Sequence, residues 1–123
     1  MKNKKLVYTA AFIMAAVAFF EFTPKKTQLF DTNLRITIQD DLGNTEEGAL
    51  VTLFANNDDY RSSSNPVAGP LKTDKKGRVT FKDLEAKAYY VYAEKGDMNN
   101  NMLGVKTDTL EGGKLNKIAI VIQ

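Results

Sequence analysis

The sequence has no cysteine, no histidine and no tryptophan, and it has only three prolines in 123 residues. The absence of cysteine excludes disulfides, thiol nucleophiles and a lipid anchor on cysteine. Without cysteine or histidine, the usual ligands of zinc, iron and copper are missing, and so are the Ser/His and Cys/His pairs of many hydrolases. We therefore expect no cofactor and no catalytic centre of these kinds.

The chain also has no large excess of positive or of negative charge. The chain carries 17 basic and 15 acidic residues, a formal net charge of +2. Three of the basic residues, Lys2, Lys4 and Lys5, lie in an N-terminal segment that we expect to be separate from the folded domain. Removing these three from the 17 leaves 14 basic against 15 acidic residues, a net charge of −1. A near-neutral domain lacks the basic surface that nucleic acid requires, so nucleic-acid binding is excluded.

The N-terminal segment has the pattern of an export signal, with lysines followed by an apolar run over residues 6–20. This run has the length of a signal-peptide core and is shorter than the ~20 residues of a typical membrane-spanning helix. Ala16-Val17-Ala18 offers a small-x-small cleavage site, although bulky phenylalanines follow it. For residues 1–18, a cleaved signal peptide and a retained membrane anchor both stay open. Both a signal peptide and an anchor place the rest of the chain on the far side of a membrane. The chain would stay in contact with that membrane only through residues 6–20, and only if they are retained.

Residues 19–32 form an aperiodic linker, and from residue 33 to residue 123 the hydrophobic period is two, which is typical of strands. The pattern predicts seven short strands near residues 34–38, 49–55, 71–73, 79–81, 88–94, 103–109 and 118–122. The last run is apolar on both faces and is expected to be an interior strand. Residues 56–70 and 97–101 are expected to be polar loops. The fold class is therefore all-β, a seven-stranded Greek-key β-sandwich of the broad immunoglobulin-like type.

A set of spaced residues resembles a known group of domains. It comprises Ile38 to Gly43, Gly48-Ala49-x-Val51-x-Leu53, Thr73, Gly77, Phe81, Leu84 and Tyr89-x-Val91-x-Ala93. This spacing resembles the carboxypeptidase regulatory-like domains, whose relatives include the transthyretin-like (prealbumin-like) sandwich and the collagen-adhesin B-type repeats. The resemblance covers nearly all of residues 33–123. One departure is Lys87, which stands where the group usually has a glycine.

Three tyrosines lie close together in one predicted strand. Alternation places Tyr89 in the core, with its hydroxyl bonded to backbone, and turns Tyr90 and Tyr92 outward. One interpretation is that Tyr90 and Tyr92 form ordinary cross-strand pairs. The other is that they form an exposed aromatic surface that binds a partner protein or a sugar.

The resemblance also suggests chemistries that the residues do not support. The transthyretin-like hydrolase of purine degradation uses histidines and a C-terminal Tyr-Arg-Gly-Ser, whereas this chain has Tyr60-Arg61-Ser62-Ser63 in mid-chain. Some collagen-adhesin repeats join a lysine to an asparagine. Here the first strand has no inward lysine to pair with Asn116, so no such crosslink is expected. The Asn/Asp-rich stretches 56–59 and 97–101 lack the spacing of a calcium loop, so no metal site is assigned.

Taken together, the sequence predicts an exported, non-catalytic accessory or structural module in the periplasm or on the outer face of a membrane. Its partner is expected to be a protein of the cell envelope or membrane. The alternative is a carbohydrate-binding module that uses exposed tyrosines. The candidate surface consists of Tyr60, Tyr90, Tyr92, Asp58 and Asp59. An enzyme is disfavoured because neighbouring carboxylates such as Asp58 and Asp59 would point to opposite faces of a strand.

Overall fold

The computed structural model describes residues 31–123. The predictions for residues 1–18, and for the linker up to residue 30, lie outside the described residues. Within residues 31–123, no helix is long and apolar enough to cross a membrane.

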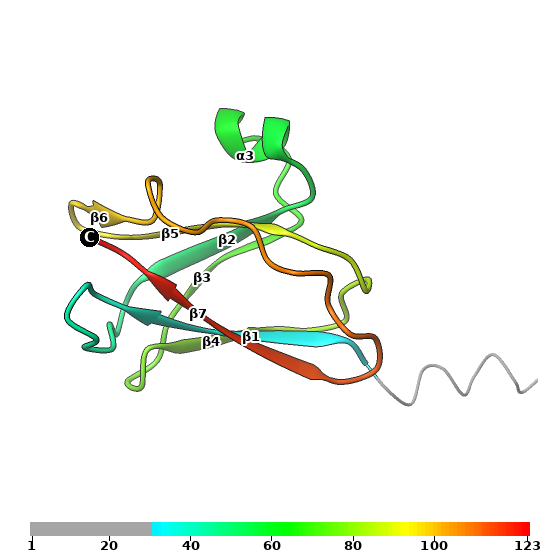
Figure 1. The fold of residues 1–123 in the computed structure, drawn as a ribbon, viewed down its shortest axis with the longest axis horizontal. Helices are drawn as coiled ribbons and strands as arrows, with labels where there is room; N and C mark the ends of the chain where they lie inside the picture. Colours follow the sequence, from blue (N-terminus) through cyan, green and yellow to red (C-terminus); the bar gives the residue numbers. More distant parts are fainter. Residues whose placement is uncertain (1–30) are drawn as a thin grey trace, which may run out of the picture. The chain divides into compact units, whose positions relative to one another are not determined.

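In the described part of the chain, seven strands form two facing sheets, and one short helix lies against the larger sheet (Figure 1). The three-stranded sheet has the order β4-β1-β7, formed by Arg78–Phe81, Asn33–Gln39 and Leu115–Val121. The four-stranded sheet has the order β3-β2-β5-β6, formed by Ala68–Lys72, Leu50–Phe54, Tyr90–Lys95 and Met98–Asn99. The helix, α3, is Asn57–Ser62. The predicted all-β sandwich is confirmed.

Strand β1 lies in the middle of its sheet, antiparallel to β4 and parallel to β7. Its inward residues Leu34, Ile36 and Ile38 are completely buried, as the period of two predicts. From the other sheet, the side chains that meet them come mainly from β2 and β5, namely Val51, Leu53, Val91 and Ala93. The alternation in the sequence thus places the core between the two sheets.

Two tight turns, one after β1 and one between β3 and β4, are each held by an aspartate at the start of the turn. The Asp40 carboxylate accepts hydrogen bonds from the backbone N–H of Leu42 and of Asn44, both at 2.9 Å. The Asp74 carboxylate accepts from the N–H of Lys76 and of Arg78. These side-chain bonds add to the backbone bonds of the same turns, from Gly43 N–H to the Asp40 carbonyl and from Gly77 N–H to the Asp74 carbonyl.

Gly77 ends the second turn at a position that only glycine fits. Its φ is +74°, and a Cβ there would lie 3.0 Å from the carbonyl oxygen of Ile38 and 2.9 Å from Cβ of Thr45. The β3–β4 turn therefore packs directly against the end of β1.

Tyr89 is buried, and its hydroxyl is bonded to backbone as predicted. In the connection before it, Asp83 has a left-handed backbone with φ of 56°, and Lys87 does not. Lys87 uses its side chain to reach over the Tyr89 ring, with Nζ 5.7 Å from the ring centroid.

Four local predictions are wrong. Residues 56–70 are not a loop throughout, because they contain α3 and the start of β3, and residues 97–101 contain the short strand β6. Residues 103–109 do not form a strand, and only Lys106 makes an isolated bridge, to Tyr90. The last strand is an edge strand rather than an interior one. Its second apolar face arises because Ala119 and Val121 line a groove beside the segment 103–108 instead of packing under another layer.

Candidate functional site

The helix α3 is fixed at both ends by side chains and turns of its own sequence. At its start, the Asn56 side chain accepts a hydrogen bond from the Asp59 N–H at 2.8 Å and donates one to the Asp59 carboxylate at 3.2 Å. At its end, Ser63 adopts the left-handed conformation and its N–H bonds to the Tyr60 carbonyl. Acidic residues in the first turn and a basic residue in the last turn also suit the helix dipole.

This short helix presents Tyr60 to the outer face of the β2–β5 sheet. The Tyr60 ring meets Phe54 edge-on, at 6.0 Å between centroids and an angle of 78°. It also lies 6.1 Å from the Tyr90 ring and 6.4 Å from the Tyr92 ring. These distances are typical of interacting aromatic pairs. We call Tyr60, Tyr90 and Tyr92 the tyrosine cluster, and Tyr60 is its centre.

Two of the three hydroxyls in the tyrosine cluster have defined partners. The Tyr60 hydroxyl donates to the side-chain oxygen of Asn101 at 2.9 Å, and the Tyr92 hydroxyl donates to the Glu94 carboxylate at 3.1 Å. Burial raises the pKa of Tyr60 above its ordinary value. Burial, followed by the hydrogen bond and charge of Glu94, raises the pKa of Tyr92. Both phenols therefore stay neutral hydrogen-bonding groups at physiological pH.

The third ring, Tyr90, has a cation beside it. The Lys106 Nζ lies 5.7 Å from the Tyr90 ring centroid, within cation–π range. The cluster is therefore supported from three directions, by α3, by β5 and by the segment that follows β6.

A groove of about 810 Å³ opens next to Tyr60 and Tyr92. The remaining lining residues are Asn57, Arg61, Ser63, Glu94, Asn101 and Met102. We call this the tyrosine groove. Met102 is 90% exposed and forms part of its wall. The groove thus combines aromatic faces with amide, carboxylate and guanidinium groups, which suits stacking and hydrogen bonding to a ligand rather than bond-breaking chemistry.

The five residues of the predicted surface do not all meet. Tyr60, Tyr90 and Tyr92 come together, although they are half-buried rather than freely exposed. Asp59 is held by Asn56 and Asn65 at the start of α3. Asp58 is exposed on the same helix, and neither aspartate lines the tyrosine groove.

Sequence reasoning missed Glu94, Asn101 and Phe54 as neighbours of these tyrosines. One available signal was Asn56, which together with Asp59 three residues later marks a helix start. A helix there would have suggested that Tyr60 points back over β2. No signal in the sequence brings Asn101 to Tyr60, because 41 residues separate them and the contact depends on how β5 and β6 turn.

The other polar features that the sequence singled out have structural roles. Asn100 is completely buried and binds the backbone of β5 through both ends of its amide. The Asn116 amide donates to the carbonyls of Asn33 and Glu111, which joins the start of β1 to the turn before β7. Within residues 31–123, no three acidic side chains converge as a metal site would require.

Comparisons with known proteins support the fold. No family model and no curated protein matches the sequence. Among solved structures, a streptococcal ancillary pilin resembles the chain at a TM-score of 0.56 and 20% identity, over 76% of this chain and 32% of the pilin. The major pilin subunit of Bacillus cereus resembles it at a TM-score of 0.53 and 15% identity, over 75% of this chain and 28% of that one. The chain thus spans about a third of the length of these pilins, and its β-sandwich has the fold of one of their domains.

Proposed function

We propose that this chain is an exported, non-catalytic module of the cell envelope or cell surface that contacts another protein through the tyrosine groove. The observation that carries the proposal is the convergence of Tyr60 from α3 with Tyr90 and Tyr92 from β5. Aromatic residues backed by a rigid sheet, with polar groups around them, are typical of the centre of protein–protein interfaces.

Two further observations support a location outside the cytoplasm. The apolar run over residues 6–20 follows a lysine-rich start, as in export signals. The sandwich also has the fold of a domain found in two bacterial pilins. The resemblance of the sequence to carboxypeptidase regulatory-like domains fits the same role, because such domains accompany other proteins rather than carry the chemistry. Retention of residues 6–20 would tether the module to the membrane.

The test is photo-crosslinking in the native cells. A photoreactive amino acid replaces Met102, which is 90% exposed at the wall of the tyrosine groove, and a matched control carries it at Leu71 on β3. We expect a crosslinked protein partner from the Met102 position and none from the Leu71 position. Adding Tyr92→Ala should then abolish the crosslink. The proposal fails if both positions give the same products, or if neither gives a protein adduct.

The second candidate is carbohydrate binding at the same groove. It is favoured by the lining itself, in which two tyrosine faces stand beside Arg61, Glu94 and Asn101. Pyranose rings stack on aromatic faces while amides and carboxylates bind their hydroxyls. Screening the purified protein on a glycan array distinguishes the two candidates. Glu94→Gln and Asn101→Ala should abolish sugar binding, whereas a protein interface centred on Tyr92 should tolerate the loss of either polar group.

A further inference from the structure

Among residues 31–123, nothing pairs with the backbone groups on the outer edge of β7 between Lys117 and Val121. Ile122 N–H bonds to the Gln39 carbonyl of β1, and Gln123 exchanges two 3.1 Å bonds with Asn99 on the opposite side. Successive residues of a strand direct their backbone N–H and C=O to alternate sides. The N–H and C=O groups of Lys117, Ala119 and Val121 therefore point away from β1, on the same side as those of Gln123. In residues 31–123, no backbone hydrogen bond joins this edge of β7 to the segment 103–108.

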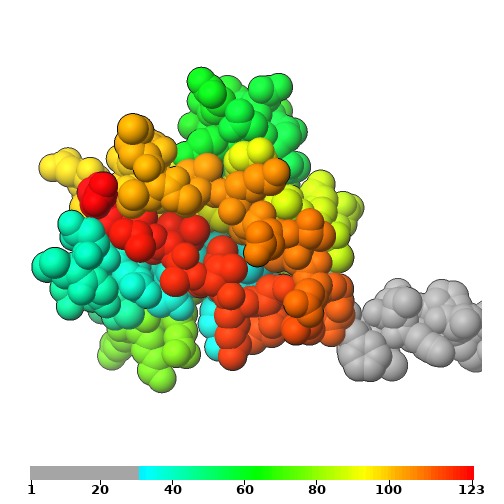
Figure 2. Space-filling model, in the orientation of Figure 1, coloured from blue at the N-terminus to red at the C-terminus, as the bar shows by residue number. Residues whose placement is uncertain are grey.

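The other sheet also has an edge, at Lys106, to which no other strand of the described residues is added. Val91 N–H bonds to the Val105 carbonyl, and Thr107 N–H bonds to the Tyr89 carbonyl. This pattern leaves the backbone N–H and C=O of Lys106 directed away from β5. The Asn99–Gln123 pair joins the two sheets at one end, and from there the two edges separate. Figure 2 shows the segment after β6 (orange) beside β7 (red) on this face.

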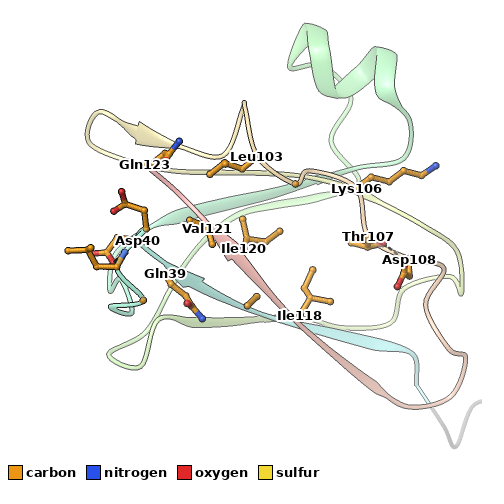
Figure 3. A pocket seen from close by; sticks show the side chains of 15 residues that line it. Gln39, Asp40, Leu103, Lys106, Thr107, Asp108, Ile118, Ile120, Val121 and Gln123 are labelled. Atoms are coloured by element: carbon orange, nitrogen blue, oxygen red, sulfur yellow. Dashed lines mark hydrogen bonds between the residues drawn. The ribbon is translucent and has the colours of Figure 1, made fainter.

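Between the two edges lies a groove of about 890 Å³, which we call the edge groove. Figure 3 shows Ile118 and Ile120 from β7 on one side of it and Lys106 on the other. Ile118 and Leu103 are only half-buried, so they leave apolar surface uncovered in the groove. Apolar side chains between two unpaired strand edges are the surroundings that an added strand requires.

Charge indicates what kind of strand fits. The charged residues that line the edge groove are Lys106 and three carboxylates, Asp40, Asp41 and Asp108. The lining therefore has an excess of two negative charges. An extended segment with basic side chains at its ends would complement these carboxylates, while an acidic one would be repelled.

We propose that the edge groove receives an extended segment of a partner protein as an additional strand on β7. The segment has an apolar side chain at every second position, which contacts Ile118 and Leu103, and lysine or arginine at its flanks. A strand rises about 3.3 Å per residue, so the stretch of β7 from Lys117 to Val121 matches the central part, about five residues long, of such a segment, and the basic flanks extend beyond it. This surface is distinct from the tyrosine groove, and either could exist without the other.

The test uses the full chain in detergent micelles and the synthetic peptide acetyl-Lys-Val-Thr-Val-Thr-Val-Lys-amide at millimolar concentration. Hydrogen exchange is followed at individual amides by NMR. The peptide should slow exchange at Lys117, Ala119 and Val121, and at Lys106 if both edges are paired. Ile118 and Ile120 serve as internal controls, because their N–H groups already bond to β1. A peptide of the same composition with its valines adjacent should protect the edge less, and one flanked by glutamates should bind more weakly.

Ala119→Pro removes an outward N–H of β7 without removing a bond to β1, and should weaken the peptide's affinity by roughly fivefold to tenfold. Asp41→Asn together with Asp108→Asn should weaken the lysine-flanked peptide while leaving a neutral analogue unchanged. The proposal is overturned if saturating peptide leaves the edge amides unprotected. It is also overturned if those amides are already protected in the chain without peptide. Protection that is the same at all protein concentrations would show that residues 1–30 cover the edge. Protection that increases with protein concentration would show that a second copy of the chain covers it. If Ala119→Pro does not fold, hydrogen exchange in the unaltered chain, with and without peptide, is sufficient to test the proposal.

Discussion

The Tyr89 hydroxyl is bonded twice to the same residue, Glu85. It donates to the Glu85 carbonyl at 3.0 Å and accepts from the Glu85 N–H at 3.0 Å. The ring is 1% exposed, so both bonds lie at the boundary of the core. One side chain therefore fixes the connection between β4 and β5 and anchors the strand on which the tyrosine cluster is built.

We expect Tyr89→Phe to lower the free energy of unfolding by about 1–3 kcal/mol, because two backbone groups of Glu85 lose their partner while the ring still fills the core. Tyr90→Phe is the matched control, since within residues 31–123 its hydroxyl makes no hydrogen bond, and it should change stability by less than about 0.5 kcal/mol. Urea denaturation of both variants measures the difference. Equal effects would show that the Tyr89–Glu85 pair contributes nothing specific.

Asn100 is expected to be among the least replaceable polar residues. Its side chain accepts from the Ala93 N–H at 2.9 Å and donates to the Val91 carbonyl at 2.9 Å, and it is completely buried. Asn100→Ala leaves both backbone groups unpaired inside the protein, which should cost about 2–4 kcal/mol. Asn99→Ala, which removes only a local bond from the Asn101 N–H at the end of β6, should cost less than about 1 kcal/mol. Thermal unfolding of the two variants tests this order.

The two aspartate turns make stability depend on pH in a defined direction. Backbone hydrogen bonds, from Asn44 to Asp40 and from Arg78 to Asp74, hold the pKa of each carboxyl below its ordinary value of 3.8. Because the folded pKa is lowered, the stabilisation is present above about pH 4 and is lost as the pH falls through the folded pKa. Asp40→Asn with Asp74→Asn should flatten the stability profile below about pH 4. A profile with unchanged slope would contradict the assignment.

Tyr92 should ionise at higher pH than an exposed tyrosine. Its pKa is raised by burial first, and then by the hydrogen bond and charge of Glu94. A raised pKa means that folding favours the neutral phenol, so stability falls as the pH rises through the unfolded value of about 10 towards the folded one. Glu94→Gln should lower the Tyr92 pKa only in part, because burial remains. Ultraviolet titration against a Tyr92→Phe reference resolves this ionisation, and an unshifted curve would refute the contact.

Much of the fold follows from local pattern. Leu34, Ile36 and Ile38 are buried because a strand with one face on the core must alternate, and the Asp40 and Asp74 turns follow from side chains that bond their own backbone. The inward position of Tyr89 follows from the same alternation. Such features depend on residues within a few positions of one another, so the sequence alone is sufficient to predict them.

Apart from the missed helix α3, whose cap is local, the errors occur where distant segments decide the outcome. Residues 103–109 have a strand-like composition, but beyond the pairing around Lys106 they leave β5 and never pair with β7. Ile118 to Ile122 are apolar on both faces, which a buried strand would explain equally well. The tyrosine cluster was recognisable as three residues but not as a groove, since Glu94 and Asn101 reach it only after β6 has turned back along β5.

The parallel pairing of β1 with β7 has a mechanical consequence. Asn33 lies beside Leu115 and Gln39 beside Val121, so the chain enters at one end of this pair and leaves at the other (Figure 1). Tension applied at Asn33 and Val121 pulls the two strands past each other along their length. All the hydrogen bonds between them are then loaded together instead of being opened one at a time. Resistance to stretching therefore resides in the β1–β7 pair, and β3 and β6 at the margins of the other sheet carry little of the load.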